Sequence, residues 1–184
     1  MGSLFSDSIR SHSVYMNKLT TYEAAWLIGG AGRAALVTFV TLATDGRLDV
    51  ADKRQRVKVA RAESTYPIEA AALALIPESG IGVGELLVRL AASGAMKDLE
   101  AAVRAKGQLR ALRWFSATYR DLLEHPGTGV RRVAVLGVPG IEDERLRDML
   151  EHPLPGMPKI DPFKPVRDNT IDGTIGPTSG SGYI

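Results

Sequence analysis

A cluster of cations is the sharpest chemical feature of the sequence. Five Lys and Arg side chains fall within nine residues: Lys53, Arg54, Arg56, Lys58 and Arg61. Cations on a hairpin can lie along a phosphate backbone, where they add salt-dependent affinity without reading the base sequence. They can equally form a solvated hairpin face, where edge charges prevent strand-to-strand aggregation. The cluster is therefore a candidate contact for nucleic acid or for an acidic partner, and the solvated face stays open as the alternative.

A second group of cations lies on a helix predicted over residues 95–106. It comprises Lys97, Arg104 and Lys106. The same helix carries Asp98 and Glu100, which DNA phosphates would repel. The other helix that could enter a groove, over residues 33–44, offers mainly threonines, whereas direct base readout typically uses Arg, Lys, Asn or Gln. The sequence therefore favours contact with a protein, and DNA binding is the alternative.

No pattern of catalytic or metal-binding residues emerges. The chain has no cysteine, which excludes thiolate metal sites, cysteine nucleophiles and disulfides. A metal site would have to bring together the residues of two Leu-Glu-His-Pro segments: Glu124, His125, Glu151 and His152. These segments are better explained as helix ends, because each precedes a proline. The glycine runs at residues 29–32 and 137–140 lack the full phosphate-binding patterns. We expect no enzymatic activity, cofactor, metal or small-molecule substrate.

Composition bounds the class of protein. The 184 residues suffice for one domain or two small ones, and 45% apolar with 24% charged residues excludes collagen and fully disordered chains. A net charge of +2 is too small for bulk coating of nucleic acid. The start of the chain lacks a signal-peptide core. The most apolar run, residues 34–43, has about half the ~20 residues of a membrane span. We expect a cytoplasmic protein without a membrane span.

Residues 1–18 are expected to form a flexible arm, and residues 19–64 a first winged-helix-like unit. Its first helix starts at Thr20 or Thr21, with Glu23 in the first turn, and stops at Gly29 and Gly30. A second, core helix runs from about residue 33 to 44. Alternating residues 47–50 and 56–60 then predict a small hairpin.

Residues 65–113 predict a second winged-helix-like unit. Helices are expected over residues 67–76, 84–92 and 95–106, followed by Gly107 and a short extended run. Residues 22–27 resemble residues 68–73 at an offset of 46, and residues 44–48 resemble 105–109 at an offset of 61. The difference between the two offsets, 61 − 46 = 15 residues, is about the length of an extra helical segment over residues 81–94. A duplication explains this similarity, and so does the alanine-rich composition of both helices. Three helices and a hairpin are typical of a winged helix, and a small helical bundle is the alternative.

The remaining chain is predicted as an annex over residues 114–152 and a tail over residues 153–184. The annex combines a helix over 114–124, a strand over 132–138 and a helix over 141–150. The tail holds six of the ten prolines and predicts an extended or disordered segment that docks on a partner. Its candidate docking residues are Pro162, Phe163, Pro165, Ile171, Ile175, Tyr183 and Ile184. The expected fold class is mainly α with small β hairpins (α+β).

One segment carries a family resemblance. Residues 22–30 read YEAAWLIGG, followed by Arg33 and by Gly46-Arg47-Leu48. This pattern resembles an uncharacterised, mainly actinobacterial family with a YE-A-x-L-x-GG opening and a G-R-L turn, and the resemblance spans about half the chain. It implies winged-helix-like units and no catalytic residues. Many members continue into membrane spans and a Gly- and Cys-rich tail, whereas this sequence has no cysteine.

Together these patterns predict a non-enzymatic protein-binding module or assembly subunit. The tail is expected to dock on a partner chain or on a neighbouring subunit of a homo-oligomer. A winged-helix DNA-binding regulator that uses the basic hairpin is the first alternative. A precursor whose tail is modified by a partner enzyme is the second.

Overall fold

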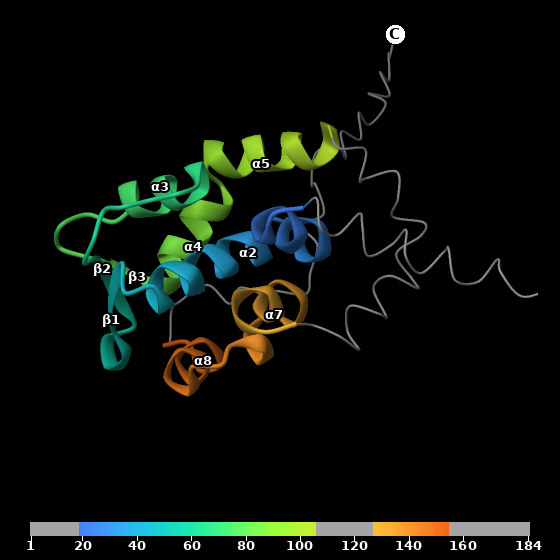
Figure 1. Cartoon of the computed structure of the whole chain (residues 1–184). Coiled ribbons are helices and arrows are strands. Elements are labelled where there is room, and N and C mark those ends of the chain that lie inside the picture. Colours follow the sequence, from blue (N-terminus) through green and yellow to red (C-terminus); the bar gives the residue numbers. More distant parts are fainter. Residues whose placement is uncertain (1–18, 106–126, 155–184) are drawn as a thin grey trace, which may run out of the picture.

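The computed structural model describes residues 19–105 and 127–154 of the chain (Figure 1). Its α-helices are α2 (Thr21–Thr44), α3 (Pro67–Ala74), α4 (Val83–Ala91), α5 (Gly94–Ala105), α7 (Gly129–Leu136) and α8 (Glu144–Glu151). Its strands are β1 (Leu48–Ala51), β2 (Arg56–Val59) and β3 (Ile81–Gly82), and the 3-10 helices are η1 (Asp52–Arg54) and η3 (Val138–Gly140). The predicted fold class, mainly α with a small antiparallel β component, is confirmed.

Helix α2 begins where the sequence predicts and continues past the predicted stop. The Thr20 hydroxyl accepts a hydrogen bond from the Glu23 N–H at 3.2 Å, and the Glu23 carboxylate accepts one from the Thr20 N–H at 2.8 Å. This capping box satisfies two donors that the helix itself leaves unpaired. The predicted stop at Gly29 and Gly30 is a kink: both glycines have non-helical backbone angles, and the helix resumes after them.

The second half of α2 is the predicted core helix. Phe39 and Leu42 are completely buried, and α2 packs against α3, α4, α5 and α7. By length and composition α2 could also cross a membrane, and 50% of its apolar window is buried inside the protein. A core helix gives the same signal because it too is apolar nearly all round.

The predicted hairpin is confirmed and has a third strand beside it. Strands β1 and β2 pair antiparallel, with Asp49 opposite Lys58 and Val50 opposite Val57. Strand β3 pairs with β2, and Ile81 lies opposite Val57. The sequence predicts helix at Ile81 because a two-residue strand is too short to show periodicity. Residues of both predicted units therefore contribute to one sheet.

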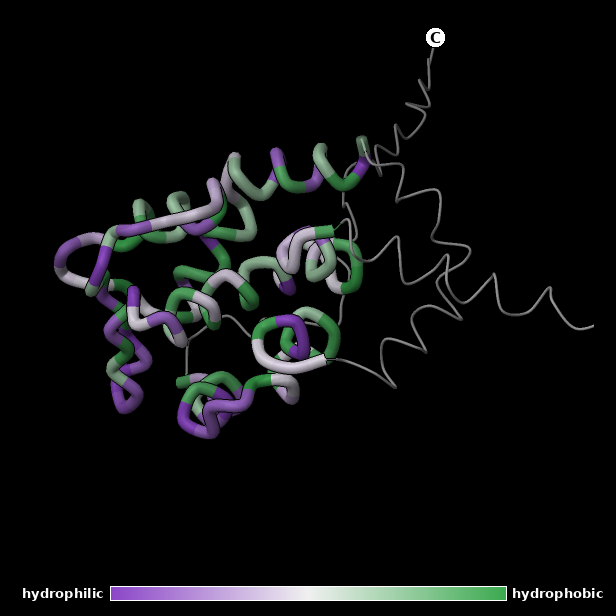
Figure 2. The backbone as a smooth tube through the Cα atoms, in the orientation of Figure 1, coloured by the Kyte–Doolittle hydropathy of each residue, from purple (hydrophilic) through white to green (hydrophobic). Residues whose placement is uncertain are grey.

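A shared apolar core joins these elements. Buried residues from Tyr22 in α2 to Met149 in α8 form one cluster, which includes Val57 in the sheet and Leu86 in α4. In Figure 2 the hydrophobic residues gather on the helices around α2. The tip of the β1–β2 hairpin, residues 52–55, is hydrophilic. Residues of the two predicted units and of the annex thus bury one another's apolar faces.

The predicted strand over residues 132–138 is wrong, because residues 132–136 belong to helix α7 and Val138 begins η3. Val133, Ala134 and Val135 are buried, and α7 packs on α2. A short run of alternating apolar residues fits either structure, and packing on α2 decides for the helix. The last predicted helix is confirmed as α8, with Asp143 as its N-cap. The predicted helix over 114–124 and the extended run after Gly107 lie outside the described residues.

Candidate functional site

The five predicted contact cations line the β1–β2 hairpin and the residues that follow it, and all five are exposed. Two of them bond to backbone oxygens. Arg56 donates a hydrogen bond to the carbonyl of Gly80 at 2.6 Å, and Arg61 donates one to that of Gly46 at 3.3 Å. Since these acceptors are neutral, neither hydrogen bond compensates the positive charge of its guanidinium group.

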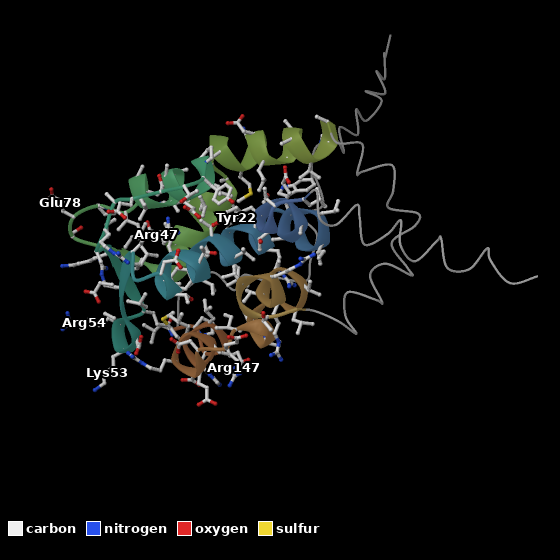
Figure 3. All side chains as sticks on the ribbon, in the orientation of Figure 1. Tyr22, Arg47, Lys53, Arg54, Glu78 and Arg147 are labelled. Atoms are coloured by element: carbon white, nitrogen blue, oxygen red, sulfur yellow. The ribbon has the colours of Figure 1, made fainter. Side chains whose placement is uncertain are left out.

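The other three cations are available to a ligand. Within the described part of the chain, the side chains of Lys53, Arg54 and Lys58 form no hydrogen bond or ion pair. Figure 3 shows Lys53 and Arg54 at the hairpin tip, pointing away from the body of the protein. A carboxylate approaching the tip would therefore meet charges that are not already paired.

The acidic residue at the tip is already paired. Asp52 forms an ion pair with Arg145 of α8, whose Nε lies 2.9 Å from the Asp52 carboxylate. The hydrogen bond to Asp52 and the attraction between the charges raise the pKa of Arg145. This exposed pair contributes little stability, but it occupies the carboxylate that directly precedes Lys53 and Arg54 in the sequence.

Gln55 fixes the tip to the folded body. Its Nε2 donates to the carbonyls of Met149 at 3.1 Å and His152 at 2.7 Å, and its Oε1 accepts from the Leu154 N–H at 3.0 Å. With φ of 46°, Gln55 is the one non-glycine residue with a positive φ among the described residues. Such a conformation persists only where surrounding contacts hold it. The sequence does not indicate this role of Gln55, because glutamine rarely adopts the left-handed backbone conformation.

The predicted cations on α5 lie apart from the hairpin. Lys97 and Arg104 are exposed, and Arg104 pairs with Glu100 one turn earlier. In Figure 1 helix α5 runs along the edge of the fold opposite the β1–β2 hairpin. Lys106 lies outside the described residues. The structure therefore does not bring the hairpin and α5 cations onto one surface.

A buried polar network connects α2, the turn after it and α3. Arg47 forms ion pairs with Glu69 and with Asp45, each at 2.7 Å. The Tyr22 hydroxyl donates a hydrogen bond to the other Glu69 oxygen, and the Thr65 N–H donates to Glu69 at 2.9 Å. Every oxygen of this carboxylate is thus paired, although the residue is almost completely buried.

The network shifts the titration of its members. Burial alone raises the pKa of Glu69, but hydrogen bonds from Arg47, Tyr22 and the Thr65 backbone outweigh it, so the net pKa is lowered. The hydrogen bond to Glu69 raises the pKa of Arg47. Burial and the bond to Glu69 raise the pKa of Tyr22. At neutral pH the network therefore holds ionised Glu69 and Arg47 beside a neutral phenol.

Arg33 is a second buried arginine. Its guanidinium donates to the carbonyls of Val133 at 3.4 Å and Val135 at 3.1 Å, near the C-terminal end of α7. A cation is favourable there because the carbonyl end of a helix is partially negative. A Cβ on Gly137 would lie 2.8 Å from Arg33 Cζ, and one on Gly29 would lie 2.7 Å from Arg33 Cβ. Both glycines therefore make room for this side chain.

The residues that carry the family resemblance have structural roles. Glu23 caps α2, and Gly29 packs against Arg33. Gly46, with φ of 65°, closes the turn after α2, and Arg47 ties that turn to α3. The motif therefore describes how the chain folds and not a reactive centre.

The remaining predicted residues are only partly described. Within residues 19–105 and 127–154, no group of three or more His, Cys, Asp or Glu could hold a metal ion. Glu151 and His152 end α8, and the His152 ring lies 3.1 Å from the Asp148 carboxylate. Glu124 and His125 lie outside the described residues. So do all seven docking residues predicted for the tail.

Comparisons with known proteins find no match to this chain among protein-family models, curated proteins or solved structures.

Proposed function

We propose that this protein is a non-enzymatic binding module that holds an acidic segment of a partner protein against its β1–β2 hairpin. The supporting observation is five exposed hairpin cations that pair with no carboxylate in the described part of the chain. Gln55 fixes the tip that carries Lys53 and Arg54. A fixed site loses little conformational entropy on binding, and complementary charge adds specificity.

The buried polar groups support a binding role over a catalytic one. A nucleophile or general base needs a functional group that can reach a substrate and exchange a proton. In the Tyr22–Arg47–Glu69 network these groups are bonded to one another, and Glu69 accepts hydrogen bonds on both oxygens. The network is thus suited to joining α2 to α3.

The arrangement of charge favours a protein over duplex DNA as the partner. A winged helix reads DNA with a helix and a wing on one face. Helix α4 packs beside β3, which supports a winged-helix interpretation. The α5 cations, however, lie away from the hairpin, and Arg104 is paired with Glu100. A DNA-binding regulator remains the alternative, and the experiment below separates the two.

The tail supports the same proposal by its point of origin. Leu154, where the described residues end, bonds to Gln55, so the tail continues from a point beside the hairpin. We propose that the tail docks on the partner or on a neighbouring subunit. Truncation after Pro153 is expected to weaken partner binding or change the oligomeric state. If both stay unchanged, the tail does not dock on a partner or subunit. The alternative, modification of the tail, is tested by the intact mass of the protein from its native host.

Binding of a fluorescein-labelled peptide of Asp and Glu, followed by fluorescence anisotropy, tests the hairpin. Charge reversal with Lys53→Glu and Arg54→Glu is expected to weaken binding at least about tenfold, because attraction becomes repulsion. The matched control is Arg131→Glu with Arg132→Glu, which makes the same charge change at two exposed arginines of α7. The control should bind nearly as tightly as the wild type.

Two results would overturn the proposal. Equal loss in both double variants would mean that only total charge matters. Binding of duplex DNA with a steep salt dependence, without binding of the acidic peptide, would favour the DNA-binding regulator. Purification from the native host at low and high salt, with and without nuclease, then identifies the partner.

A further inference from the structure

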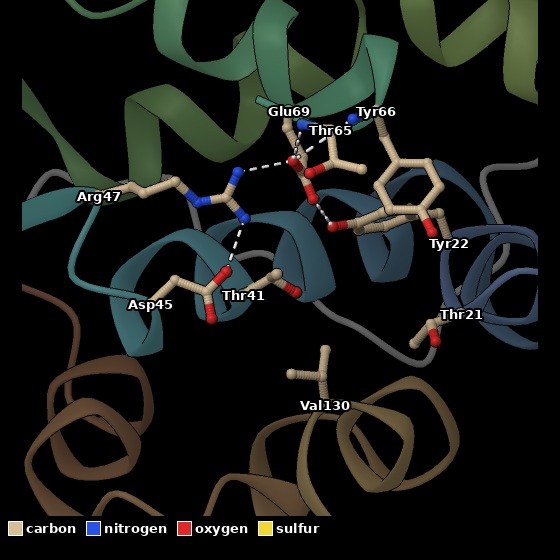
Figure 4. Close-up of a pocket in the computed structure, with 9 residues that line it drawn as sticks. All are labelled: Thr21, Tyr22, Thr41, Asp45, Arg47, Thr65, Tyr66, Glu69 and Val130. Atoms are coloured by element: carbon tan, nitrogen blue, oxygen red, sulfur yellow. Dashed lines mark hydrogen bonds and ion pairs between the residues drawn. The ribbon is translucent and has the colours of Figure 1, made fainter. Parts of the chain in front are cut away.

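A polar cavity of about 250 Å³ lies between the start of α2, the turn after α2 and α3 (Figure 4). Its lining residues include Tyr22, Thr41, Asp45, Tyr66 and Glu69. Sites for drug-sized ligands have volumes of about 300–1,000 Å³. This cavity therefore fits a side chain or a small molecule, and it does not include the cations of the hairpin tip.

The cavity presents hydrogen-bond acceptors. The Tyr22 hydroxyl donates its hydrogen bond to Glu69, and the Thr41 hydroxyl donates its own to the Val37 carbonyl at 2.8 Å. The two hydroxyls also contact each other, and the lone pairs that this contact leaves on them can accept hydrogen bonds. Asp45 uses Oδ2 in its ion pair, and its side chain is 53% exposed, so Oδ1 is a further acceptor. A ligand that bonds to these three oxygens must therefore bring donors, although the hydroxyls of Thr21, Thr65 and Tyr66 in the same lining can also donate.

Charge and aromatic rings select a cation among such ligands. The lining holds two carboxylates, Asp45 and Glu69, against one guanidinium, Arg47, while Tyr22 stays neutral. The rings of Tyr22 and Tyr66 have centroids 5.2 Å apart and planes at 71°. Tyr66 is 43% exposed, so an approaching ligand can contact its ring. The faces of such rings attract cations.

We propose that this cavity binds a primary alkylammonium group. An ammonium is compact and carries three donors, which match the oxygens of Tyr22, Thr41 and Asp45. The alkyl chain would pass the Tyr66 ring toward solvent. The group could belong to a lysine side chain of a protein or to a free amine, and both share this chemistry. The site is independent of the hairpin and of the function proposed for it.

The test is a titration of the isotope-labelled full chain with n-butylammonium chloride, followed by amide chemical shifts. Saturable shifts are expected at Thr41, Asp45 and Tyr66, and the neutral isostere n-butanol should not cause them. Asp45→Asn is expected to weaken butylammonium binding about tenfold, as removal of a charge-assisted hydrogen bond typically does. Asp49→Asn is the matched control, because Asp49 is exposed on β1 and outside the cavity lining.

A second variant protects the test against loss of structure. Tyr66→Leu removes the ring but leaves the Tyr66 backbone N–H that points at Glu69, and it is expected to weaken binding several-fold. Nα-acetyl-lysine methylamide in place of butylammonium distinguishes the sources: tighter binding indicates a lysine side chain, and equal binding a free amine.

Butanol shifts equal to those of butylammonium, or no saturation by either, would overturn the proposal. An equal loss in the Asp45 and Asp49 variants would do the same. The Lys53→Glu, Arg54→Glu protein should bind butylammonium like the wild type, so failure of this site and failure of the hairpin function are distinguishable.

Discussion

The buried arginines and the hairpin cations show how differently one residue type can be used. Arg33 and Arg47 are 1% and 8% exposed, and their guanidinium groups bond to backbone carbonyls and carboxylates. Arg54 carries the same group at the hairpin tip, where it is exposed and makes no side-chain bond within the described residues. Burial and bonding, and not residue type, distinguish a cation that stabilises the fold from one that is available to bind a partner.

The two regions are expected to fail in opposite ways. Removal of a buried charge leaves its former partner unpaired in a poorly solvated place, which destabilises the folded state. Removal of an exposed, unpaired charge leaves the fold unaffected and changes only the electrostatic potential at the surface that binds the partner. Stability and binding should therefore separate cleanly between the two sets.

The largest effect is expected for Arg47→Met. It leaves the buried Glu69 carboxylate without its cation, so the free energy of unfolding should fall by about 3–5 kcal/mol. Urea unfolding at pH 7 measures this loss. Arg54→Met is the matched control and should stay within about 0.5 kcal/mol of the wild type. Similar losses for both variants would erase the contrast between the two regions.

A somewhat smaller effect is expected for Gly137→Ala. Gly137 has φ of 74°, and an added Cβ would lie 2.8 Å from Arg33 Cζ. Backbone strain and overpacking together should lower the free energy of unfolding by about 2–4 kcal/mol. Gly94→Ala, with no atom within 4 Å of the added Cβ, is the control and should be neutral or slightly stabilising. Equal melting temperatures for the two variants would show that Arg33 does not need this space.

The stabilisation that Glu69 provides should depend on pH. Its pKa is lower in the folded protein than the ordinary value of 4.5. The stabilisation is therefore complete above pH 4.5, and it is lost as the pH falls through the folded pKa. Urea unfolding of the wild type and of Glu69→Gln at pH 7 and pH 3 isolates this contribution. The advantage of the wild type over the variant should shrink at pH 3, and an advantage that grows would contradict the lowered pKa.

The smallest effect on stability is expected for Lys53→Glu with Arg54→Glu. Neither side chain is bonded in the described structure, so the free energy of unfolding should change by no more than about 0.5 kcal/mol. This double variant is also expected to bind the acidic peptide more weakly than the wild type. A large loss of stability would mean that these cations serve the fold, and that their loss of binding is indirect.

Local patterns predicted the elements whose causes are local. The start of the first helix at Thr20 or Thr21, with Glu23 in its first turn, and the apolar core helix depend on neighbours along the chain, and both are confirmed. The predicted stop at Gly29 and Gly30 is a kink within α2. The hairpin and its exposed cations follow from strand alternation over residues 47–60. The resemblance of residues 22–27 to 68–73 aligns Glu23 with Glu69, and each acid accepts a hydrogen bond from the backbone N–H three residues earlier, at the start of its helix.

The remaining features depend on contacts between segments that are far apart in the sequence. Tyr22 bonds to Glu69 across 47 residues, and Gln55 bonds to the Leu154 N–H across 99 residues. Strand β3 exists because β2 offers it an edge, and α7 is a helix because it packs on α2. The amino-acid sequence specifies which side chains carry charge and where helices and strands can begin. Which charges are buried and bonded, and which remain for a partner, depends on contacts between distant segments, because burial and pairing set the energy of a charge and arise only when those segments meet.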